Sequence, residues 1–200
     1  MHHATHEAIV CAVRPHGETG AILRAFTHDE GMLAGFVQGA KGRVLRPILI
    51  PGNVIRGDWR VRVPGQLPSL TVEPIHSRAH LLSEPLALAA IDWITALTAA
   101  TLPEGHAYPR LHDALDGVLQ AIELAPAARR WAGGVAQYEA ILLSELGYAE
   151  QVGGGAATEA PVALMAANRK RLVEHVLGER RIDIMAARER LVDRLKRAVA

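Results

Sequence analysis

Six cationic side chains gather in one short stretch of the chain, residues 39–62. The stretch has a single acidic residue, so its net charge is +5, whereas the whole chain of 200 residues carries only +1. A nearly neutral protein that concentrates cations in this way commonly presents them to a polyanion. The chemistry expected here is charge neutralisation, with the phosphates of a nucleic-acid backbone as the target. The six residues are Lys41, Arg43, Arg46, Arg56, Arg60 and Arg62.

The second half of this stretch alternates between apolar and charged residues, as a half-buried strand does. One face receives Ile55, Trp59, Val61 and Val63, and the other receives Arg56, Asp58, Arg60 and Arg62. Three arginines on one face can follow a phosphate chain, although a solvated strand face is the alternative. Aromatic residues make up only 4% of the chain, and Phe26 and Phe36 are weak candidates for base stacking. The sequence therefore predicts salt-sensitive contact with the nucleic-acid backbone.

No catalytic motif is found in the chain. There is no G-x-x-x-x-G-K-[ST] phosphate loop, no G-x-S-x-G and no H-E-x-x-H. The lone Cys11 is expected to be a buried, inert thiol, because it falls in an apolar stretch. We expect His2, His3 and His6 to lie in a mobile terminus, and the acids of the middle region to be solvated on helix faces. These features predict a protein that is not an enzyme and holds neither metal nor cofactor.

Composition also indicates the compartment. A single cysteine excludes an intrachain disulfide and fits a reducing environment. No apolar run reaches the roughly 18 residues that a membrane span needs. The first residues lack the basic-then-apolar layout of a signal peptide. We therefore expect a cytoplasmic protein without a membrane partner.

Short β-prone runs joined by glycine and proline turns fill the first 80 residues. Five such runs in so short a segment favour a small closed barrel, because an open sheet would leave two edges unpaired. The basic loop and the alternating strand then lie on one barrel. The expected strands are residues 7–14, 21–28, 32–38, 53–63 and 70–75.

The pattern changes from strand to helix at Ser83, a good N-cap followed by Pro85. Further helices are expected to begin near Pro109 and Pro126 and over 162–177 and 184–198. Net charge is +3 in residues 1–83, −7 in 84–167 and +5 in 168–200, which suggests different partners for different regions. The sequence thus predicts an α+β, multi-domain chain. It comprises a barrel domain (1–80) and an all-helical domain (81–200), with a glycine-rich connector at 150–161.

A series of short motifs resembles the RecO family of bacterial recombination mediators. The likeness covers roughly residues 7–150, in the family's order and spacing. Its front part lies in the barrel region, and its last part lies in the third predicted helix. The matching segments are Arg14–Thr19 (RPHGET), Phe26-Thr27, Gly31, Gln38–Lys41 (QGAK), Leu49–Gly52 (LIPG), Tyr138-Glu139, Leu142-Leu143 and Leu146–Tyr148 (LGY).

This resemblance implies an OB-fold barrel followed by a helical domain. It also implies binding to single- and double-stranded DNA and annealing of complementary strands. The DNA-binding set predicted on both grounds adds Arg14 and Arg24 to the six cations named above. Family members act with RecR and load RecA onto DNA coated by single-stranded-DNA-binding protein (SSB), so the expected location is cytoplasmic and nucleoid-associated.

Two further features depend on the resemblance. The family docks on the acidic, apolar-ended C-terminal tail of SSB, and Arg129 and Arg130 beside Trp131 are the paired cations of the acidic middle region. These three residues are therefore the predicted tail site, and helix-start residues that only aid solubility are the alternative. Many family members carry a cysteine-rich zinc insertion after the third helix, but this chain has no cysteine there, so zinc is not expected.

Two other functions remain open from the sequence. One is a generic OB-fold RNA-binding protein, and the other is a helical interaction scaffold whose barrel is only structural. Binding to DNA and RNA across a salt series separates these possibilities from a DNA-binding recombination mediator.

Overall fold

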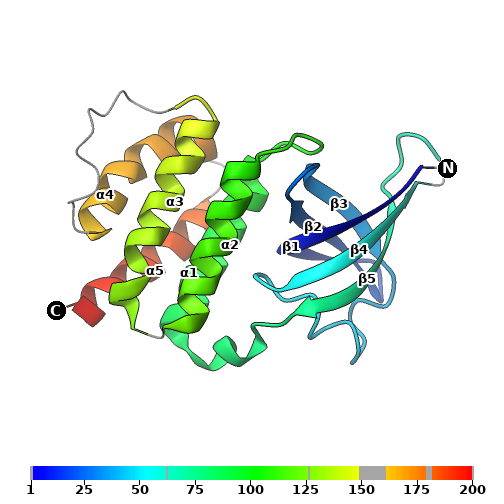
Figure 1. Cartoon of the computed structure of the whole chain (residues 1–200), viewed down its shortest axis with the longest axis horizontal. Helices are drawn as coiled ribbons and strands as arrows, with labels where there is room; N and C mark the ends of the chain where they lie inside the picture. The colour runs from blue at the N-terminus through cyan, green and yellow to red at the C-terminus, as the bar shows by residue number, and fades with distance from the viewer. Residues whose placement is uncertain (1, 62, 126, 149–160, 179–181, 200) are drawn as a thin grey trace. The chain divides into compact units, whose positions relative to one another are not determined.

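The N-terminal part of the chain forms five strands that close into a barrel (Figure 1). The computed structural model describes residues 2–61, 63–125, 127–148, 161–178 and 182–199. The strands found there are β1 (His2–His16), β2 (Gly20–Thr27), β3 (Gly31–Val37), β4 (Val54–Val61) and β5 (Ser69–His76). Their order around the barrel is β1-β2-β3-β5-β4, and β3 and β5 meet in parallel at Phe36 and Ser69. This order is that of an OB-fold, which confirms the fold class predicted for this half.

Strand β1 is longer than the sequence predicted. Its first half, His2 to Ile9, pairs with β4, and its second half pairs with β2. A register shift between Val10 and Ala12 marks the bend that lets one strand serve both neighbours. The expectation of a mobile histidine-rich terminus is therefore wrong, because those histidines lie in a paired strand. His3, for example, contacts the Asp58 carboxylate through its Nε2 atom.

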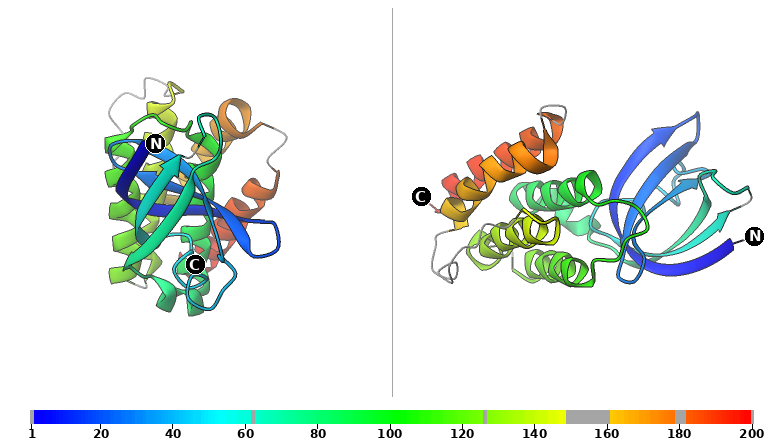
Figure 2. Two further views of the ribbon diagram at one scale, coloured as in Figure 1. Left: turned by 90° about the vertical axis from the view of Figure 1, so that its right-hand side faces the viewer. Right: turned by 90° about the horizontal axis from the view of Figure 1, so that it is seen from above.

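The barrel core is built around Trp59, whose side chain is 4% exposed. Two glycines make room for the indole ring. A Cβ atom on Gly57 would lie 2.3 Å from the ring, and one on Gly35 would lie 2.7 Å from the neighbouring Leu70. Ile55 and Trp59 point inward while Arg56 and Arg60 are exposed, which confirms the predicted alternation for these four residues. Val63 was expected on the apolar face as well, but β4 ends at Val61 and Val63 is 48% exposed. Both views of Figure 2 show the strands curving around this core.

A segment from the helical half of the sequence returns to the barrel. The chain forms two compact units, the first of Met1–His80 with Leu102–His112 and the second of Leu81–Thr101 with Asp113–Ala200. In the first unit, Glu104 forms a bridge with Met32, and the Gly105 amide donates to the Met32 carbonyl at 3.1 Å. The barrel domain predicted from the sequence, residues 1–80, lacks this segment.

The second unit consists of packed helices. α1 (Pro85–Thr101) opens at a proline, and α5 packs on α1 while α4 packs on α3. Gly147 and Gly178, with φ of 83° and 59°, follow α3 and η3 as glycines with positive φ. Residues 150–160 of the expected connector lie outside the described residues. The remaining elements are η1 (Ala79–Ser83), α2 (Pro109–Leu124), η2 (Ala128–Arg130), α3 (Ala132–Glu145), α4 (Pro161–Arg171), the π-helical turn η3 (Leu172–Leu177) and α5 (Ile182–Val199).

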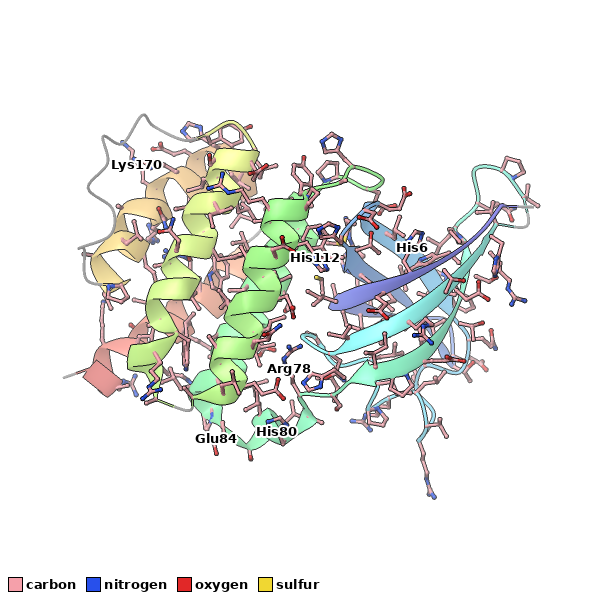
Figure 3. The ribbon with its side chains drawn as sticks, viewed as in Figure 1. His6, Arg78, His80, Glu84, His112 and Lys170 are labelled. Carbon is pink, nitrogen blue, oxygen red and sulfur yellow. The ribbon has the colours of Figure 1, made fainter. Side chains whose placement is uncertain are left out.

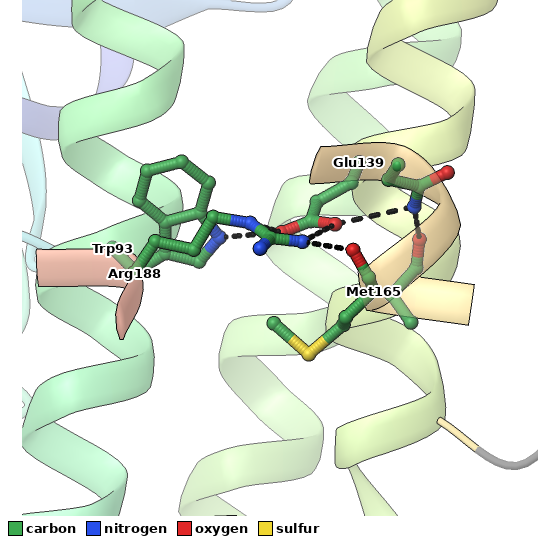
Figure 4. A network of polar contacts seen from close by, with 6 residues as sticks. Trp93, Glu139, Met165 and Arg188 are labelled. Carbon is green, nitrogen blue, oxygen red and sulfur yellow. Dashed lines mark hydrogen bonds and ion pairs between the residues drawn. The ribbon is translucent and has the colours of Figure 1, made fainter. Parts of the chain in front are cut away.

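A buried ion pair ties four of these helices together (Figure 4). Arg188 of α5 donates from Nε and Nη2 to the two carboxylate oxygens of Glu139 of α3, both at 2.9 Å. Trp93 Nε1 of α1 donates to the same carboxylate at 2.9 Å, and Asn168 Nδ2 of α4 donates at 3.2 Å. Both charged residues are at most 2% exposed. The expectation that the acids of this region are solvated is therefore wrong for Glu139.

Burial raises the pKa of the Glu139 carboxyl, and the hydrogen bonds from Arg188, Asn168 and Trp93 oppose that rise. Arg188 also donates to the Met165 carbonyl and lies 5.7 Å from the centre of the Trp93 ring. The pair is thus satisfied on both sides, as a buried charge requires. In the part of the chain that the structure describes, no helix combines the length and the apolar character needed to traverse a bilayer.

Candidate nucleic-acid interface

The loop between β3 and β4 carries three of the predicted cations, Lys41, Arg43 and Arg46, and is anchored to the barrel core. Leu49 belongs to the barrel core, and Leu45 and Ile48 pack against it. Asn53 Nδ2 donates to the carbonyls of Pro47 and Ile48 at 3.0 and 3.1 Å. Its Oδ1 accepts from the backbone amide of Arg78, the buried residue after β5 that is labelled in Figure 3, at 2.8 Å. These contacts hold the loop in one place on the barrel.

All three cations of this loop are exposed, and Arg43 and Arg46 are the two without a carboxylate or carbonyl partner among the described residues. Neither forms an ion pair with a carboxylate in the described part of the chain. Val44 between them is 76% exposed. Since Leu49 anchors the loop in the core and the two arginines are unpaired, the loop presents positive charge that an anion can neutralise.

Lys41 has a second role that the sequence did not reveal. Its ammonium group donates to the carbonyls of Gly17 and Glu18 at 3.1 and 2.7 Å, and its backbone amide donates to the Thr19 carbonyl at 3.2 Å. Lys41 therefore joins its loop to the turn between β1 and β2. An ammonium group has three donors, so one is left for a phosphate oxygen after these two bonds.

The arginines of β4 are exposed but lie among carboxylates. Arg60 donates from Nε and Nη2 to Asp58 Oδ2 at 2.9 and 2.7 Å. Arg56 lies 3.6 Å from the Glu7 carboxylate, and the register places Glu73 opposite it on β5. Exposed ion pairs contribute little to stability, so these arginines can exchange their carboxylate partners for a phosphate. The same carboxylates, however, repel a phosphate that approaches. Arg62 lies outside the described residues.

The two arginines predicted on β1 and β2 differ in their surroundings. Arg24 donates from Nη2 to the Leu102 carbonyl at 3.2 Å, and its Nη1 lies 3.3 Å from Glu104. Its side chain is 28% exposed, so its main role is to hold the returning segment 102–112. Arg14 is exposed on β1 opposite Ile22 of β2. Of this pair, only Arg14 is available to a ligand.

The described residues offer no metal site. Among them, no group of three or more histidine, cysteine, aspartate or glutamate side chains could hold a metal ion. Cys11 is buried, as predicted, and burial raises the pKa of its thiol to about 12. A neutral thiol is a poor nucleophile. The cations of the barrel therefore remain the candidate site.

Comparisons with known proteins identify the family of the chain. The model of the N-terminal domain of recombination protein O matches residues 1–78, and the model of the C-terminal domain matches residues 82–200. The chain belongs to the RecO family. Among curated RecO proteins, each named DNA repair protein RecO, the chain is 38% identical over 154 residues to that of Gluconacetobacter diazotrophicus. It is 39% identical over 155 residues to that of Caulobacter vibrioides and 35% identical over 179 residues to that of Methylorubrum populi.

These RecO relatives are longer than the matched region. The match covers 76% of this chain but 61% of the Gluconacetobacter protein, and 77% of this chain but 63% of the Caulobacter protein. For the Methylorubrum protein, the corresponding shares are 86% and 70%. The chain thus spans about three fifths of the length of the first two RecO proteins.

The structure describes the side chains of two residues of the predicted tail site of this RecO-family chain. Arg130 is exposed, but Trp131 has no exposed surface and belongs to the helical core. The side chain of Arg129 lies outside the described residues. A different hollow of about 220 Å³ lies between α4 and α5, with Val162 and Ala166 on one wall. The cations Arg169 and Lys196 and the acids Glu189 and Asp193 also line it, together with Val192 and Arg188.

Proposed function

We propose that this chain binds single- and double-stranded DNA through its barrel and serves DNA repair and recombination without enzymatic turnover. Membership of the RecO family supports a role in DNA repair, since the curated relatives are named DNA repair proteins. The observation that carries the DNA-binding surface is the anchored loop with the exposed, unpaired Arg43 and Arg46. Positive charge held on a rigid OB-fold is suited to a nucleic-acid backbone.

The mechanism follows from electrostatics. Each cation that pairs with a phosphate releases a condensed counterion, so binding weakens as salt concentration rises. Two strands held on the same positive surface repel each other less than in solution, because part of their charge is neutralised. Complementary bases can then pair without ATP or a covalent intermediate. Annealing of complementary strands is therefore the proposed activity of the barrel.

The decisive experiment is a salt series of binding and annealing. Affinity for single-stranded DNA, duplex DNA and RNA is measured by filter binding, and annealing is measured with complementary labelled oligonucleotides. The proposal expects binding to both DNA forms, with affinity that falls steeply as salt rises. A clear preference for RNA would instead support an RNA-binding protein. Absence of binding at low salt would leave the helical scaffold as the better interpretation.

Charge reversal of the loop, Arg43→Glu with Arg46→Glu, is expected to weaken DNA binding more than charge reversal on β4. Loss of two phosphate contacts lowers affinity for DNA roughly tenfold. For single strands it also makes the slope of log binding constant against log salt concentration shallower by about 1.4. The matched variant, Arg56→Glu with Arg60→Glu, changes the same number of charges. Its arginines already face Glu7 and Asp58, so we expect a smaller loss. Equal or reversed losses in the two double variants would contradict the central role of the loop.

We further propose that the chain acts with RecR and with the acidic tail of SSB, and thereby assists RecA loading. A tail that is acidic and ends in an aromatic residue needs a cation beside an accessible apolar wall. Arg130 is exposed, but the buried Trp131 offers no such wall. The hollow between α4 and α5 combines Lys196 with Val162 and Ala166, and is our preferred position for the tail.

The tail proposal can be tested by fluorescence anisotropy with an acidic peptide that ends in phenylalanine. We expect Lys196→Ala to weaken peptide binding about twofold to fivefold, the usual range for one exposed charge contact. Arg130→Ala is the matched control and is expected to leave binding unchanged. If Arg130→Ala weakens binding and Lys196→Ala does not, the tail belongs at the site predicted from the sequence.

A further inference from the structure

The outward face of β1, β2 and β3 carries three rows of residues, which follow from the strand register. The first row, Ile9, Phe26 and Met32, is at most 1% exposed and lies where the segment 102–112 returns. In the second row, Arg24 is held by Leu102 and Glu104 of the same segment. The third row is open to solvent in part, because its arginine is exposed while its two apolar residues are half-buried. It consists of Arg14, Ile22 and Phe36.

Phe36 occupies an unusual position in this open row. Its ring lies across Gly20 of β2, where a Cβ atom would be only 2.4 Å from ring atoms Cε2 and Cζ. Only a residue without a side chain can be placed under the ring. Beyond it, the exposed His16 of β1 meets Phe36 edge-on, with ring centres 5.9 Å apart and planes at 80°. The two rings thus lie next to each other on the outer surface, over strands β1 and β2.

The position of these rings is held from two sides. The Phe36 amide donates to the Pro68 carbonyl at 2.8 Å, at the point where β3 meets β5 and closes the barrel. Lys41 fastens the turn of residues 17–19, which connects His16 to Gly20. Both rings therefore sit on restrained backbone. A preorganised aromatic surface binds a flexible ligand without the cost of ordering its own side chains.

The charge around these rings favours an anionic chain. Arg14 is exposed two residues before His16 and forms no ion pair with the described carboxylates. Strands 2 and 3 of an OB-fold form the face that commonly receives oligonucleotides. Unpaired bases stack on aromatic rings, including that of histidine, whereas the bases of a duplex are already stacked on one another. The sequence suggested Phe36 only weakly, because the open row and the partner His16 follow from the strand register.

We propose that Phe36 and His16 form a stacking platform for the unpaired bases of single-stranded DNA, with Arg14 contacting an adjoining phosphate. This inference rests on the proposed DNA binding and adds a contact to the bases themselves. In this proposal, the loop cations Arg43 and Arg46 contact the DNA backbone, and the stacking platform contacts the bases. Single strands then retain binding at salt concentrations that weaken the phosphate contacts, because stacking releases no counterions.

The test compares two oligonucleotides of equal charge, oligothymidine of twenty residues and an abasic strand of the same length. Their affinities for the full chain are measured by fluorescence anisotropy at low and moderate salt. We expect the chain to prefer oligothymidine about tenfold, in line with base–aromatic stacking. Phe36→Leu keeps an apolar side chain over Gly20, and His16→Ala alters an exposed residue, so both variants are expected to fold. Each is expected to reduce the preference severalfold while the affinity for the abasic strand stays the same.

Arg43→Gln is the matched control for this comparison. It removes a phosphate contact, so it is expected to lower both affinities by the same factor and to leave the preference unchanged. If the chain binds both strands equally, or if neither Phe36→Leu nor His16→Ala alters the preference, the stacking platform is wrong while DNA binding stands. If the chain binds neither strand at low salt, the proposed function itself fails.

Discussion

Replacement of Arg188 by methionine is expected to lower the free energy of unfolding of the helical unit by about 3–5 kcal/mol. The substitution leaves the Glu139 carboxylate buried with only two of its donors, Trp93 and Asn168. A buried charge that loses its partner keeps the full cost of leaving water. Urea unfolding followed by tryptophan fluorescence measures the loss, because Trp93 and Trp131 both lie in this unit.

The loss in Arg188→Met is expected to depend on pH. Burial raises the pKa of Glu139, and the substitution removes the strongest interaction that opposes the rise. The folded state then binds a proton more tightly than the unfolded chain does. The contribution of Glu139 to stability is therefore fully present below the pKa of unfolded glutamate, about 4.3, and is lost as pH rises through the raised folded value. The unfolding free energy of the variant should be lower at pH 8 than at pH 5.

A double variant separates the cost of an unpaired charge from the value of the pair. In Glu139→Gln with Arg188→Met, both charges are gone, and buried ion pairs replaced by neutral residues are often no less stable than the original. We expect the double variant to recover most of the stability that the single variant loses. If the double variant loses the sum of the losses measured for Arg188→Met alone and for Glu139→Gln alone, the residues are not energetically coupled, and the structural role assigned to this pair is wrong.

Replacement of Gly31 by alanine is the second substitution expected to have a large effect, at least about 3 kcal/mol. Gly31 has φ of 75°, where an alanine costs roughly 1–2 kcal/mol. A Cβ atom there would also lie 1.8 Å from the carbonyl oxygen of His106, a backbone atom that cannot turn away. Segment 102–112 would have to move off the barrel, with loss of the Gly105–Met32 hydrogen bond, worth about 1 kcal/mol. The apolar face beneath the segment would then meet water.

Gly17→Ala is the matched control for this prediction. Gly17 has a similar φ of 67°, but a Cβ atom there would have no neighbouring atom within 4 Å, so only the conformational cost of about 1–2 kcal/mol applies. Thermal unfolding compares the two variants, and hydrogen exchange at the Gly105 amide reports whether the segment has left. Equal destabilisation by the two substitutions, with the Gly105 amide still protected, would show that the segment is not held at Gly31.

Local patterns explain why much of the fold could be predicted. Apolar residues two apart in β4, and prolines and glycines at helix ends, act through neighbours in the sequence. The inward Ile55 and Trp59, the start of α1 at Pro85 and the positive φ of Gly147 and Gly178 all follow from such rules. These features depend on backbone geometry and burial over a few residues, which the sequence displays directly.

Other features depend on contacts between distant residues. The pairing of His2–Ile9 with β4 and the return of segment 102–112 leave no local periodicity to detect. Glu139 and Arg188 are 49 residues apart, and nothing near either residue indicates that it is buried. Phe36 and His16 meet because β2 between them has a glycine at position 20. Such contacts are decided by strand register and helix packing.

The sequence by itself determined the order of barrel and helices, the family, and the stretch in which positive charge is concentrated. Only the tertiary structure decided what each cation can do. Folding brings Glu7 to Arg56, Leu102 to Arg24 and the turn carbonyls to Lys41, while Arg43, Arg46 and Arg14 face solvent. The physical reason is that net charge is a property of composition, whereas a binding surface depends on the partners that surround each charge in space.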